Sequence, residues 1–231
     1  MAQRGAFVVI EGLDRSGKTT QTEIIRKLIQ EAGKEVVCIK FPDRTTPIGQ
    51  MIDSYLRSHS DLDDHVVHLL FSANRWELAS AILGHLDKGK IVLCDRYAFS
   101  GIAFSVAKSL PLEPESPHLQ PVSSTNLPAI TLPWARAPDA SLPAPDLTLF
   151  LDISPEAARN RGGYGEERYE KASIQRRVRK VFEELGREIN GDGKWIVVDA
   201  GQDMSTVTEN MWGNIQPLLN GFNSPIGRLW K

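Results

Sequence analysis

The stretch AFVVIEGLDRSGKTTQ (residues 6–21), near the start of the chain, decides the fold. Its first five residues are apolar, which is typical of a strand buried on both faces of a parallel sheet. The spacing G-x-x-x-x-G-K-T then begins at Gly12 and opens an amphipathic helix predicted over residues 18–32. In this context the backbone N–H groups of the loop and the positive end of the helix dipole converge on one point. The stretch therefore predicts a loop that binds phosphate groups.

Four residues of this loop have expected roles in binding a nucleotide. Gly12 and Gly17 permit the tight backbone path, Lys18 reaches the β- and γ-phosphates, and the hydroxyl of Thr19 holds Mg²⁺. By itself the loop predicts only a nucleoside triphosphate site. The candidate nucleotide-binding residues of the loop are Gly12, Asp14, Arg15, Ser16, Gly17, Lys18, Thr19 and Thr20.

Further apolar, β-branched runs alternate with helical patterns along the chain. Strands are predicted over 35–41, 90–97, 147–153 and 194–200, and helices over about 63–86, about 171–190 and from near 203. Strand and helix alternating in this way predict a doubly wound α/β sandwich with right-handed crossovers. We expect one domain over residues 1–231, because neither a repeat nor a second domain is evident.

The composition excludes several functional classes. The 27 Lys and Arg residues against 29 Asp and Glu residues give a net charge of −2, so no nucleic-acid polymer or anionic membrane is expected as partner. No apolar run approaches the length of a membrane span, and the N-terminus lacks a signal-peptide core. Cys38 and Cys94 lie in apolar runs and are expected to be buried, reduced thiols. We expect a cytoplasmic protein, with the nucleus as a further compartment.

One segment interrupts the alternating pattern. Residues 109–145 contain nine of the 14 prolines, no glycine and only one Lys or Arg, Arg136. Prolines at this spacing predict an extended surface loop, and the insert proper is placed at about 109–133. A tolerated insertion and a binding segment are both compatible with this composition.

The kind of nucleotide enzyme depends on a second anion site. The Asn-Lys-x-Asp motif of a GTPase is absent, whereas a small kinase needs cations that face the loop. Arg44 and Arg96 each follow a predicted strand, where ligands bind in open α/β sheets. Asp95 also ends a strand and is a candidate for the Mg²⁺ shell, with a structural carboxylate as the alternative.

The helix predicted over about 63–86 carries a third candidate site. Phe71 and Arg75 are four residues apart and therefore share one face. A ring beside a guanidinium can stack a base and donate hydrogen bonds to it, although Phe71 alone could equally be core. Arg161 is a fourth candidate cation, at the start of RGGYGEERYE.

Six segments together resemble thymidylate kinase of the eukaryotic type: GLDRSGKTTQ, KFPDR, DDHVVHLLFSANRWE, CDRYAFSGIAF, PDLTLFLD and RGGYGEERYE. The resemblance covers about residues 6–108 and 134–201 in order. It implies the P-loop nucleoside monophosphate kinase fold, a mostly parallel five-stranded sheet flanked by helices, with a mobile lid over about 161–170. It also implies Mg-dependent transfer of the γ-phosphoryl group of ATP to dTMP, giving dTDP and ADP for dTTP synthesis, by a homodimer.

By position, the resemblance implies roles around the reacting phosphates. Asp14 contacts the 3′-hydroxyl of the acceptor and orients Arg15, which meets the transferring phosphoryl group. Arg44 and Arg96 hold the dTMP phosphate, with Phe41 beside them. The implied catalytic residues are Arg15, Lys18, Asp95 and Arg96, and the implied metal ligands are Thr19 and Asp95.

Roles for the two bases follow in the same way. Phe71 stacks on thymine, Arg75 donates to its O4, and Tyr169 crowds the 2′ position of the sugar. The other implied substrate contacts are Ser100, Gly101 and Phe104, and the implied contacts of the ATP adenine are Arg161, Ala200 and Gly201. With an arginine in the phosphate loop, the lid tip at 163–165 can dispense with a catalytic one.

Two alternatives remain open at this point. A kinase for deoxynucleosides or for other monophosphates would keep the same loop, but Arg44 beside Arg96 favours an acceptor that already carries a phosphate. A catalytically weak scaffold would also keep the fold, although every expected phosphate ligand is present.

Overall fold

The computed structural model describes residues 3–110, 127–159, 161, 168–169, 171–189 and 194–231. Its centre is a sheet of five strands in the order β2-β3-β1-β4-β5, and every neighbouring pair is parallel. The strands are β1 (Phe7–Gly12), β2 (Val36–Lys40), β3 (Ile91–Asp95), β4 (Leu147–Asp152) and β5 (Trp195–Asp199). All five lie within two residues of the predicted ends, so the doubly wound, parallel α/β fold is confirmed.

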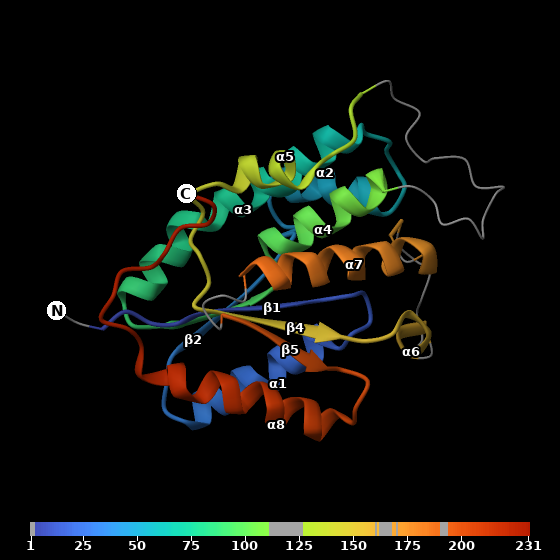
Figure 1. The fold of residues 1–231 in the computed structure, drawn as a ribbon. Coiled ribbons are helices and arrows are strands. Elements are labelled where there is room, and N and C mark those ends of the chain that lie inside the picture. The colour runs from blue at the N-terminus through green and yellow to red at the C-terminus, as the bar shows by residue number, and fades with distance from the viewer. Residues whose placement is uncertain (1–2, 111–126, 160, 162–167, 170, 190–193) are drawn as a thin grey trace.

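Helices cover both faces of this sheet (Figure 1). Below the sheet lie α1 (Lys18–Glu31) and α8 (Met204–Ile215), and directly above it lie α4 (Ala98–Ser109) and α7 (Ala172–Ile189). The long α3 (Asp64–Asp87) crosses outside α4. The shorter elements are α2 (Pro47–Leu56), α5 (Leu132–Arg136), the 3₁₀ turn η1 (Ala137–Asp139), α6 (Pro155–Arg159) and the 3₁₀ turn η3 (Gln216–Asn220).

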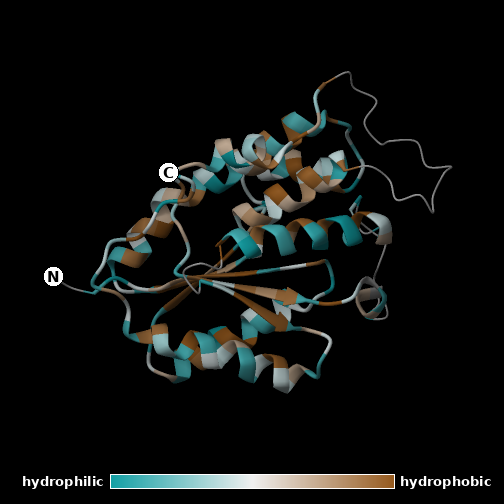
Figure 2. Ribbon diagram, in the orientation of Figure 1, coloured by the Kyte–Doolittle hydropathy of each residue, from teal (hydrophilic) through white to brown (hydrophobic). Residues whose placement is uncertain are grey.

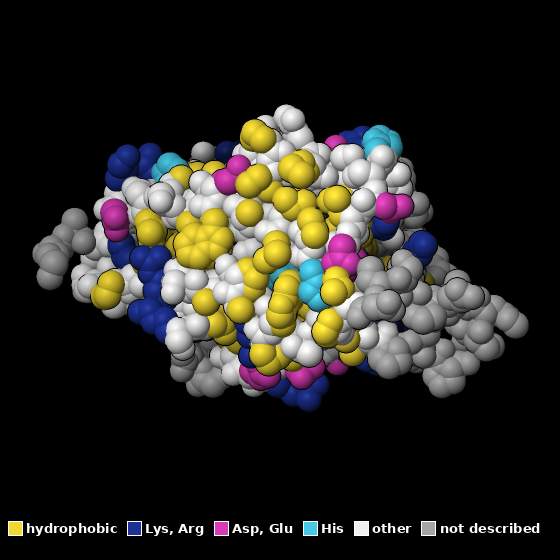
Figure 3. All heavy atoms as spheres, turned by 90° about the horizontal axis from the view of Figure 1, so that it is seen from above, with side chains coloured by type: hydrophobic (Ala, Val, Ile, Leu, Met, Phe, Trp, Pro, Cys, Tyr) yellow, Lys and Arg dark blue, Asp and Glu magenta, His cyan; other side chains and the backbone are white. Residues whose placement is uncertain are grey.

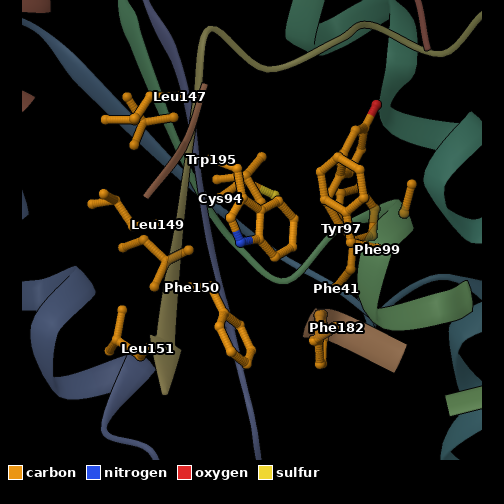
Figure 4. Close-up of a cluster of buried hydrophobic side chains, with 14 of the residues drawn as sticks. Phe41, Cys94, Tyr97, Phe99, Leu147, Leu149, Phe150, Leu151, Phe182 and Trp195 are labelled. Atoms are coloured by element: carbon orange, nitrogen blue, oxygen red, sulfur yellow. The ribbon is translucent and has the colours of Figure 1, made fainter. Parts of the chain in front are cut away.

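The core lies between the sheet and its two helical layers. The strands are mostly hydrophobic, whereas the helices alternate between hydrophobic and hydrophilic residues (Figure 2). The core above the sheet consists largely of aromatic side chains. Figure 4 shows that rings from different elements point toward one another. The Phe150 ring lies 4.8 Å from Phe182 and 5.8 Å from Trp195, centroid to centroid. Such packing makes the sheet a rigid support for the loops at its carboxyl edge.

Three expectations need correction. α2 was not predicted, although Pro47 follows the capping residue Thr46, whose side chain accepts a hydrogen bond from Gly49 N. Residues 132–139 are not an extended loop but form α5 and η1. The prolines of these turns lie in the first turn, where a missing N–H costs no hydrogen bond.

Cys38 is the third correction, because its side chain is exposed, whereas Cys94 is buried. β2 is an edge strand, so its outer side has no neighbouring strand to cover it. Burial raises the pKa of the Cys94 thiol well above its ordinary value. Both thiols are free of disulfide bonds.

Parts of two predicted segments lie outside the described residues: 111–126 of the proline-rich insert, and 162–167 and 170 of the lid, including its tip. In the described part of the chain, no helix combines the length and apolar character that crossing a membrane requires.

Candidate active site

Two adjoining pockets open at the carboxyl edge of the sheet. The open pocket has a volume of about 680 Å³ and is lined by the phosphate loop, by strand ends and by residues near β5. The narrow pocket, of about 90 Å³, lies under α3 and α4. Their common wall consists of Asp14, Phe41, Pro42, Arg44 and Arg96. A group bound at this wall can therefore face ligands in both pockets.

The phosphate loop is wrapped around the Lys18 ammonium group. This group donates to the carbonyl oxygens of Leu13 (2.6 Å) and Gly12 (3.2 Å) and lies 3.3 Å from the Ser16 hydroxyl. Burial, with a smaller contribution from the positive charge of Arg96, lowers the pKa of Lys18 to about 7. Gly17, at φ 92°, gives the left-handed turn that starts α1. The ammonium group is thus held inside the loop by uncharged acceptors, which an anion can replace.

Arg15 also lines the open pocket, and its backbone is left-handed, at φ 63°. For a residue with a side chain this region is uncommon and is costly in energy. Its carbonyl oxygen accepts a hydrogen bond from Arg161 Nη1 at 3.2 Å. The loop therefore presents Arg15 through a conformation that a glycine would adopt more easily.

A hydroxyl and a carboxylate meet beside the loop. The Thr19 hydroxyl donates to Asp95 Oδ2 at 2.8 Å, and the other oxygen of this carboxylate, Oδ1, is buried without a hydrogen-bond partner. Lys40 Nζ lies 3.2 Å from the Thr19 hydroxyl and 3.6 Å from Asp95 Oδ2. The described residues contain no group of three or more His, Cys, Asp or Glu that could hold a metal. Since Mg²⁺ prefers oxygen ligands and takes several from phosphates and water, Thr19 and Asp95 fit such an ion.

Asp14 bridges the two pockets. Its carboxylate forms a short ion pair with Arg96 and accepts a hydrogen bond from Gln175 Nε2 at 2.7 Å. Gln175 Nε2 also donates to the carbonyl oxygen of Tyr169 at 3.0 Å. Asp14 therefore orients Arg96 in this structure. Gln175 was not predicted, because a polar residue in an amphipathic helix gives no signal that it is buried.

A second unpredicted residue, Glu11, organises the start of α4. Its fully buried carboxylate accepts from Tyr97 N (2.9 Å), Ser100 N (3.0 Å) and the Ser100 hydroxyl (2.5 Å). Ser100 in turn accepts from Arg96 Nη1 at 3.1 Å. Burial raises the pKa of Glu11, against the opposing effect of these hydrogen bonds. A lone acid in the apolar run of β1 is the signal that could have identified it.

Arg44 reaches the common wall from the loop after β2. Its Nη1 pairs with Asp53 of α2 at 2.7 Å. The buried Asn74 of α3 fixes the same loop through two hydrogen bonds. Its Oδ1 accepts from Asp43 N at 2.8 Å, and its Nδ2 donates to the Asp43 carbonyl oxygen at 3.2 Å. α2 and α3 therefore hold Arg44 at the common wall, which Arg96 also lines.

The narrow pocket is lined mainly by rings. Phe71 lines one side, and Phe104 faces Tyr169 at 5.4 Å between ring centroids. The Arg96 guanidinium lies 5.5 Å from the centre of the Phe104 ring. Arg75, buried except for its contact with the pocket, completes the lining. A flat, mostly apolar ligand with one polar edge fits this composition.

Tyr169 is fixed from outside the pocket. Its hydroxyl lies 3.3 Å from that of Tyr55, and Lys108 Nζ sits 4.7 Å from the centre of its ring. The same ammonium group pairs with Asp64 at 2.6 Å. These contacts bind the end of the predicted lid to α2, α3 and α4.

The far end of the open pocket lies near the end of β5. Arg161 spans it, because its Nη2 donates to the Ala200 carbonyl while its Nη1 reaches the loop. Ala200 lines the pocket as predicted, together with the unpredicted Gln202, Met204 and Val207. Gly201 N instead donates to the Asp199 carboxylate at 2.9 Å.

The predicted residues therefore gather in one place. The positions that line the two pockets are Asp14, Arg15, Ser16, Gly17, Lys18, Thr19, Thr20, Phe41, Arg44, Phe71, Arg75, Asp95, Arg96, Ser100, Gly101, Phe104, Arg161, Tyr169 and Ala200. Six further lining residues were missed, since nothing in their local sequence separates them from ordinary surface or core positions: Gln21, Lys40, Pro42, Leu56, Tyr97 and Ser105.

The chain is similar to known proteins over nearly its whole length. The family model of thymidylate kinase matches residues 10–132 and 122–211. The thymidylate kinase of Danio rerio is 42% identical over 230 residues, with 99% of each chain covered. That of Homo sapiens is 38% identical over 231 residues, covering 100% of this chain and 99% of the other. A solved structure of thymidylate kinase from Candida albicans superposes with a TM-score of 0.86 at 39% identity, covering 99% of both chains.

Proposed function

Since the chain belongs to the thymidylate kinase family and is a nucleoside monophosphate kinase, we propose that it transfers the γ-phosphoryl group of ATP to dTMP. The observation that carries this proposal is the common wall of the two pockets. Arg44, Arg96 and Asp14 lie where a triphosphate in the open pocket would meet a monophosphate from the narrow pocket. Phosphoryl transfer requires such positioning and charge neutralisation more than a strong base.

Different residues of the site would bind the donor, ATP, and the acceptor, dTMP. Lys18, released from the loop carbonyls, holds the β- and γ-phosphates, and Arg15 faces the group in transfer. Arg44 and Arg96 hold the acceptor phosphate, and Asp14, fixed by Arg96 and Gln175, accepts the hydrogen bond of the acceptor's 3′-hydroxyl. Positive charge on both sides of the wall offsets the negative charge of the transition state.

Thr19 and Asp95 are the residues that would hold Mg²⁺. When bound there, the ion neutralises charge on the donor phosphates. Asp95 Oδ1, which is buried without a hydrogen-bond partner, would be the ligand of the ion. Lys40 Nζ lies 3.6 Å from the other oxygen of this carboxylate. Asp95 is thus proposed as a metal ligand and not as a general base.

The base of dTMP would lie in the narrow pocket. Phe71 would stack on the ring, Arg75 would donate to O4, and Ser100, Gly101 and Phe104 would form the wall. Tyr169 would lie against the 2′ carbon, where a ribose hydroxyl has no room. Arg161 and Ala200 would frame the adenine of ATP at the other end.

Steady-state turnover with dTMP, dUMP, dCMP, dAMP and dGMP, each with ATP and Mg²⁺, tests the proposal by coupling ADP release to a spectroscopic signal. We expect dTMP to have the highest kcat/KM. A protein that turns over another monophosphate, or an unphosphorylated deoxynucleoside, faster than dTMP would contradict it. Omission of Mg²⁺ should abolish turnover if Thr19 and Asp95 hold the metal.

We also propose that the enzyme is a homodimer formed through α3. Three large apolar side chains on its outer face are 43–47% exposed: Val66, Leu69 and Trp76. They fall at i, i+3 and i+10, which is one stripe of a helix. Figure 3 shows hydrophobic side chains gathered over this upper face of the molecule. A stripe of this kind on a long helix is typical of an interface between two copies.

Leu69→Glu tests the dimer. Light scattering should give the mass of two chains for the wild type and of one for the variant. Val197→Glu, which alters an exposed apolar residue on the edge strand β5, is the matched control and should remain dimeric. A monomeric wild type would contradict the proposal.

A further inference from the structure

Arg75, the charged residue that lines the narrow pocket but not the open one, has a partner outside both pockets. Arg75 Nε donates to Asp139 Oδ1 at 3.0 Å and Nη2 donates to Asp139 Oδ2 at 2.6 Å. The two side chains are 2% and 0% exposed. The Ser72 hydroxyl donates to the same Oδ1 at 2.7 Å. This forked pair lies within the protein interior, with the pocket on one side of the guanidinium and Asp139 on the other.

The fork fixes the direction of the remaining donors. A guanidinium has five N–H groups in one plane, and Asp139 accepts from two of its nitrogens. Nη1 is the nitrogen that Asp139 does not use. Because the plane of the fork cannot turn without breaking both bonds, Nη1 keeps one orientation beside the pocket lining.

The backbone of α4 holds the guanidinium from a third side. A Cβ atom on Gly101 would lie 2.8 Å from both Nη1 and Nη2 of Arg75. Contacts shorter than 3.0 Å are not tolerated, so only glycine at this position permits the guanidinium to lie where it does. Asp139, Ser72 and Gly101 come from η1, α3 and α4, and therefore three elements determine the place of one side chain.

The pairing also changes what the pocket can bind. Asp139 neutralises the charge of Arg75 before any ligand enters, so the pair offers directed hydrogen-bond donors without a net positive charge. Such donors suit a neutral carbonyl oxygen, and they oppose an amino group, which is itself a donor. Arg44 and Arg96 are also paired, with Asp53 and Asp14, but both line the common wall of the two pockets, where a phosphate would bind.

We propose that Asp139 is a positioning residue for base recognition: by holding Arg75 in the forked pair, it gives the narrow pocket its preference for a pyrimidine with a carbonyl at position 4 over one with an amino group. This inference rests on the proposed function and deepens it. Asp139 touches no substrate, and it acts through Arg75. The proline-rich segment, through its η1 turn, thereby contributes to specificity.

The comparison of dTMP with dCMP tests the proposal, because the two differ at position 4. In Asp139→Asn, the side-chain amide keeps the shape but replaces one acceptor with a donor. We expect the KM for dTMP to rise roughly tenfold, in line with the loss of one hydrogen bond from a charged donor. The ratio of kcat/KM for dTMP over dCMP should fall by the same factor, while kcat for dTMP stays within about threefold.

Asp146→Asn is the matched control. Asp146 forms a similar pair with Arg4, at 2.7 Å to Nη1 and 2.8 Å to Nη2, far from both pockets. Both variants should lower the melting temperature, but only Asp139→Asn should change the ratio. If Asp139→Asn lowers stability as Asp146→Asn does and leaves the ratio within twofold of the wild type, the pair is only structural and the proposal is overturned.

Gly101→Ala keeps the test decisive if Asp139→Asn does not fold. The added methyl group displaces the guanidinium while Asp139 remains, so the same fall in the ratio is expected. An unchanged ratio in folded Gly101→Ala overturns the proposal. A wild type without preference for dTMP over dCMP overturns both this inference and the proposed function, whereas a preference that no variant alters overturns the inference alone.

Discussion

The two pockets use positive charge in opposite ways. The open pocket is lined by six cationic side chains, Arg15, Lys18, Lys40, Arg44, Arg96 and Arg161, against two acidic ones, Asp14 and Asp95. In the narrow pocket, Arg75 is already neutralised by Asp139, which is fully buried behind it. Excess charge suits a polyphosphate, and a neutral pair suits an uncharged base. The same residue type therefore attracts an anion in one pocket and selects a carbonyl group in the other.

The difference lies in how each charge is held. Lys40 is 60% exposed and Arg44 is 37% exposed, so solvent supports their charge in addition to the pairs with Asp95 and Asp53. Arg75 is excluded from solvent and requires a permanent partner. Removing a cation from the open pocket should therefore affect binding and turnover, whereas a change around Arg75 should affect specificity and stability together.

Lys18→Ala should have the largest effect and should be confined to the open pocket. Loss of the ammonium group that reaches the β- and γ-phosphates should remove nearly all turnover, because no other lysine lies inside the loop. Circular dichroism should show a folded protein, and calorimetry should show unchanged dTMP binding in the narrow pocket. Lys27→Ala, an exposed position on the same helix, is the control. More than a tenth of wild-type turnover at saturating ATP would contradict the assigned role of Lys18.

Arg15→Gly should have the second-largest effect on turnover. This variant separates catalysis from nucleotide binding within the open pocket. Arginines that meet the charge of the transition state contribute roughly 10³–10⁵ in rate, and the low end is expected here because Lys18 remains. Since Arg15 has φ 63°, glycine at this position fits the backbone, and lost activity reports the side chain. Turnover should be compared with dissociation constants from equilibrium titration.

One result would contradict a role of Arg15 in the transition state. If ATP affinity falls a hundredfold while turnover stays within a factor of three, Arg15 binds the ground state only. Arg161, which contacts the Arg15 carbonyl, could replace part of the lost charge. The double variant Arg15→Gly/Arg161→Ala is therefore the stricter test.

Phe71→Ala should affect only the narrow pocket. Stacking of a base on an aromatic ring contributes about 1–3 kcal/mol, so the KM for dTMP should rise by roughly five- to a hundredfold while that for ATP stays constant. Leu70→Ala, on the same helix and packed against the same small core cluster, is the control for lost packing. Equal changes in the two variants would show that Phe71 is core and not a stacking platform.

The pH dependence of ATP binding should be smaller and should belong to the open pocket. In the free protein, burial lowers the pKa of Lys18 to about 7, and phosphates bound beside it should raise that pKa again. Above pH 7 the complex then holds more protons than the free protein, so ATP affinity should fall with rising pH, by at most about tenfold per pH unit. Calorimetry at pH 8 in buffers of different ionisation enthalpy should detect proton uptake on ATP binding. In Lys18→Arg, which stays charged, this uptake should disappear.

Deletion of residues 112–126 should have the smallest effect of these changes, because we expect it to alter ligand binding in neither pocket. The segment's composition predicts no regular element, and its flanks are already joined, because Ile130 N donates to the Ser109 hydroxyl at 3.0 Å. Ile130 must be kept, since its side chain is buried in the core. A short Gly/Ser linker should leave the KM values for both nucleotides and the mass in light scattering unchanged. A monomeric or inactive variant would show that the segment has a structural or functional role.

The sequence by itself determined the fold and most of the open pocket. β-Branched runs predicted all five strands, because a strand buried on both faces has a continuous apolar pattern. The phosphate loop was predicted because its pattern is local: eight consecutive residues, Gly12 to Thr19, form it where β1 ends and α1 begins.

Only the tertiary structure decided which partners the charged side chains have. Asp139 lies 64 residues from Arg75, Gln175 lies 161 residues from Asp14, and Glu11 lies 89 residues from Ser100. No periodicity in a sequence marks a partner so distant, because the contact depends on how separate elements pack and not on the local backbone. An exposed arginine and a buried, neutralised one look alike in the sequence. Their surroundings differ because desolvation, which makes a partner obligatory, arises only when the chain has folded.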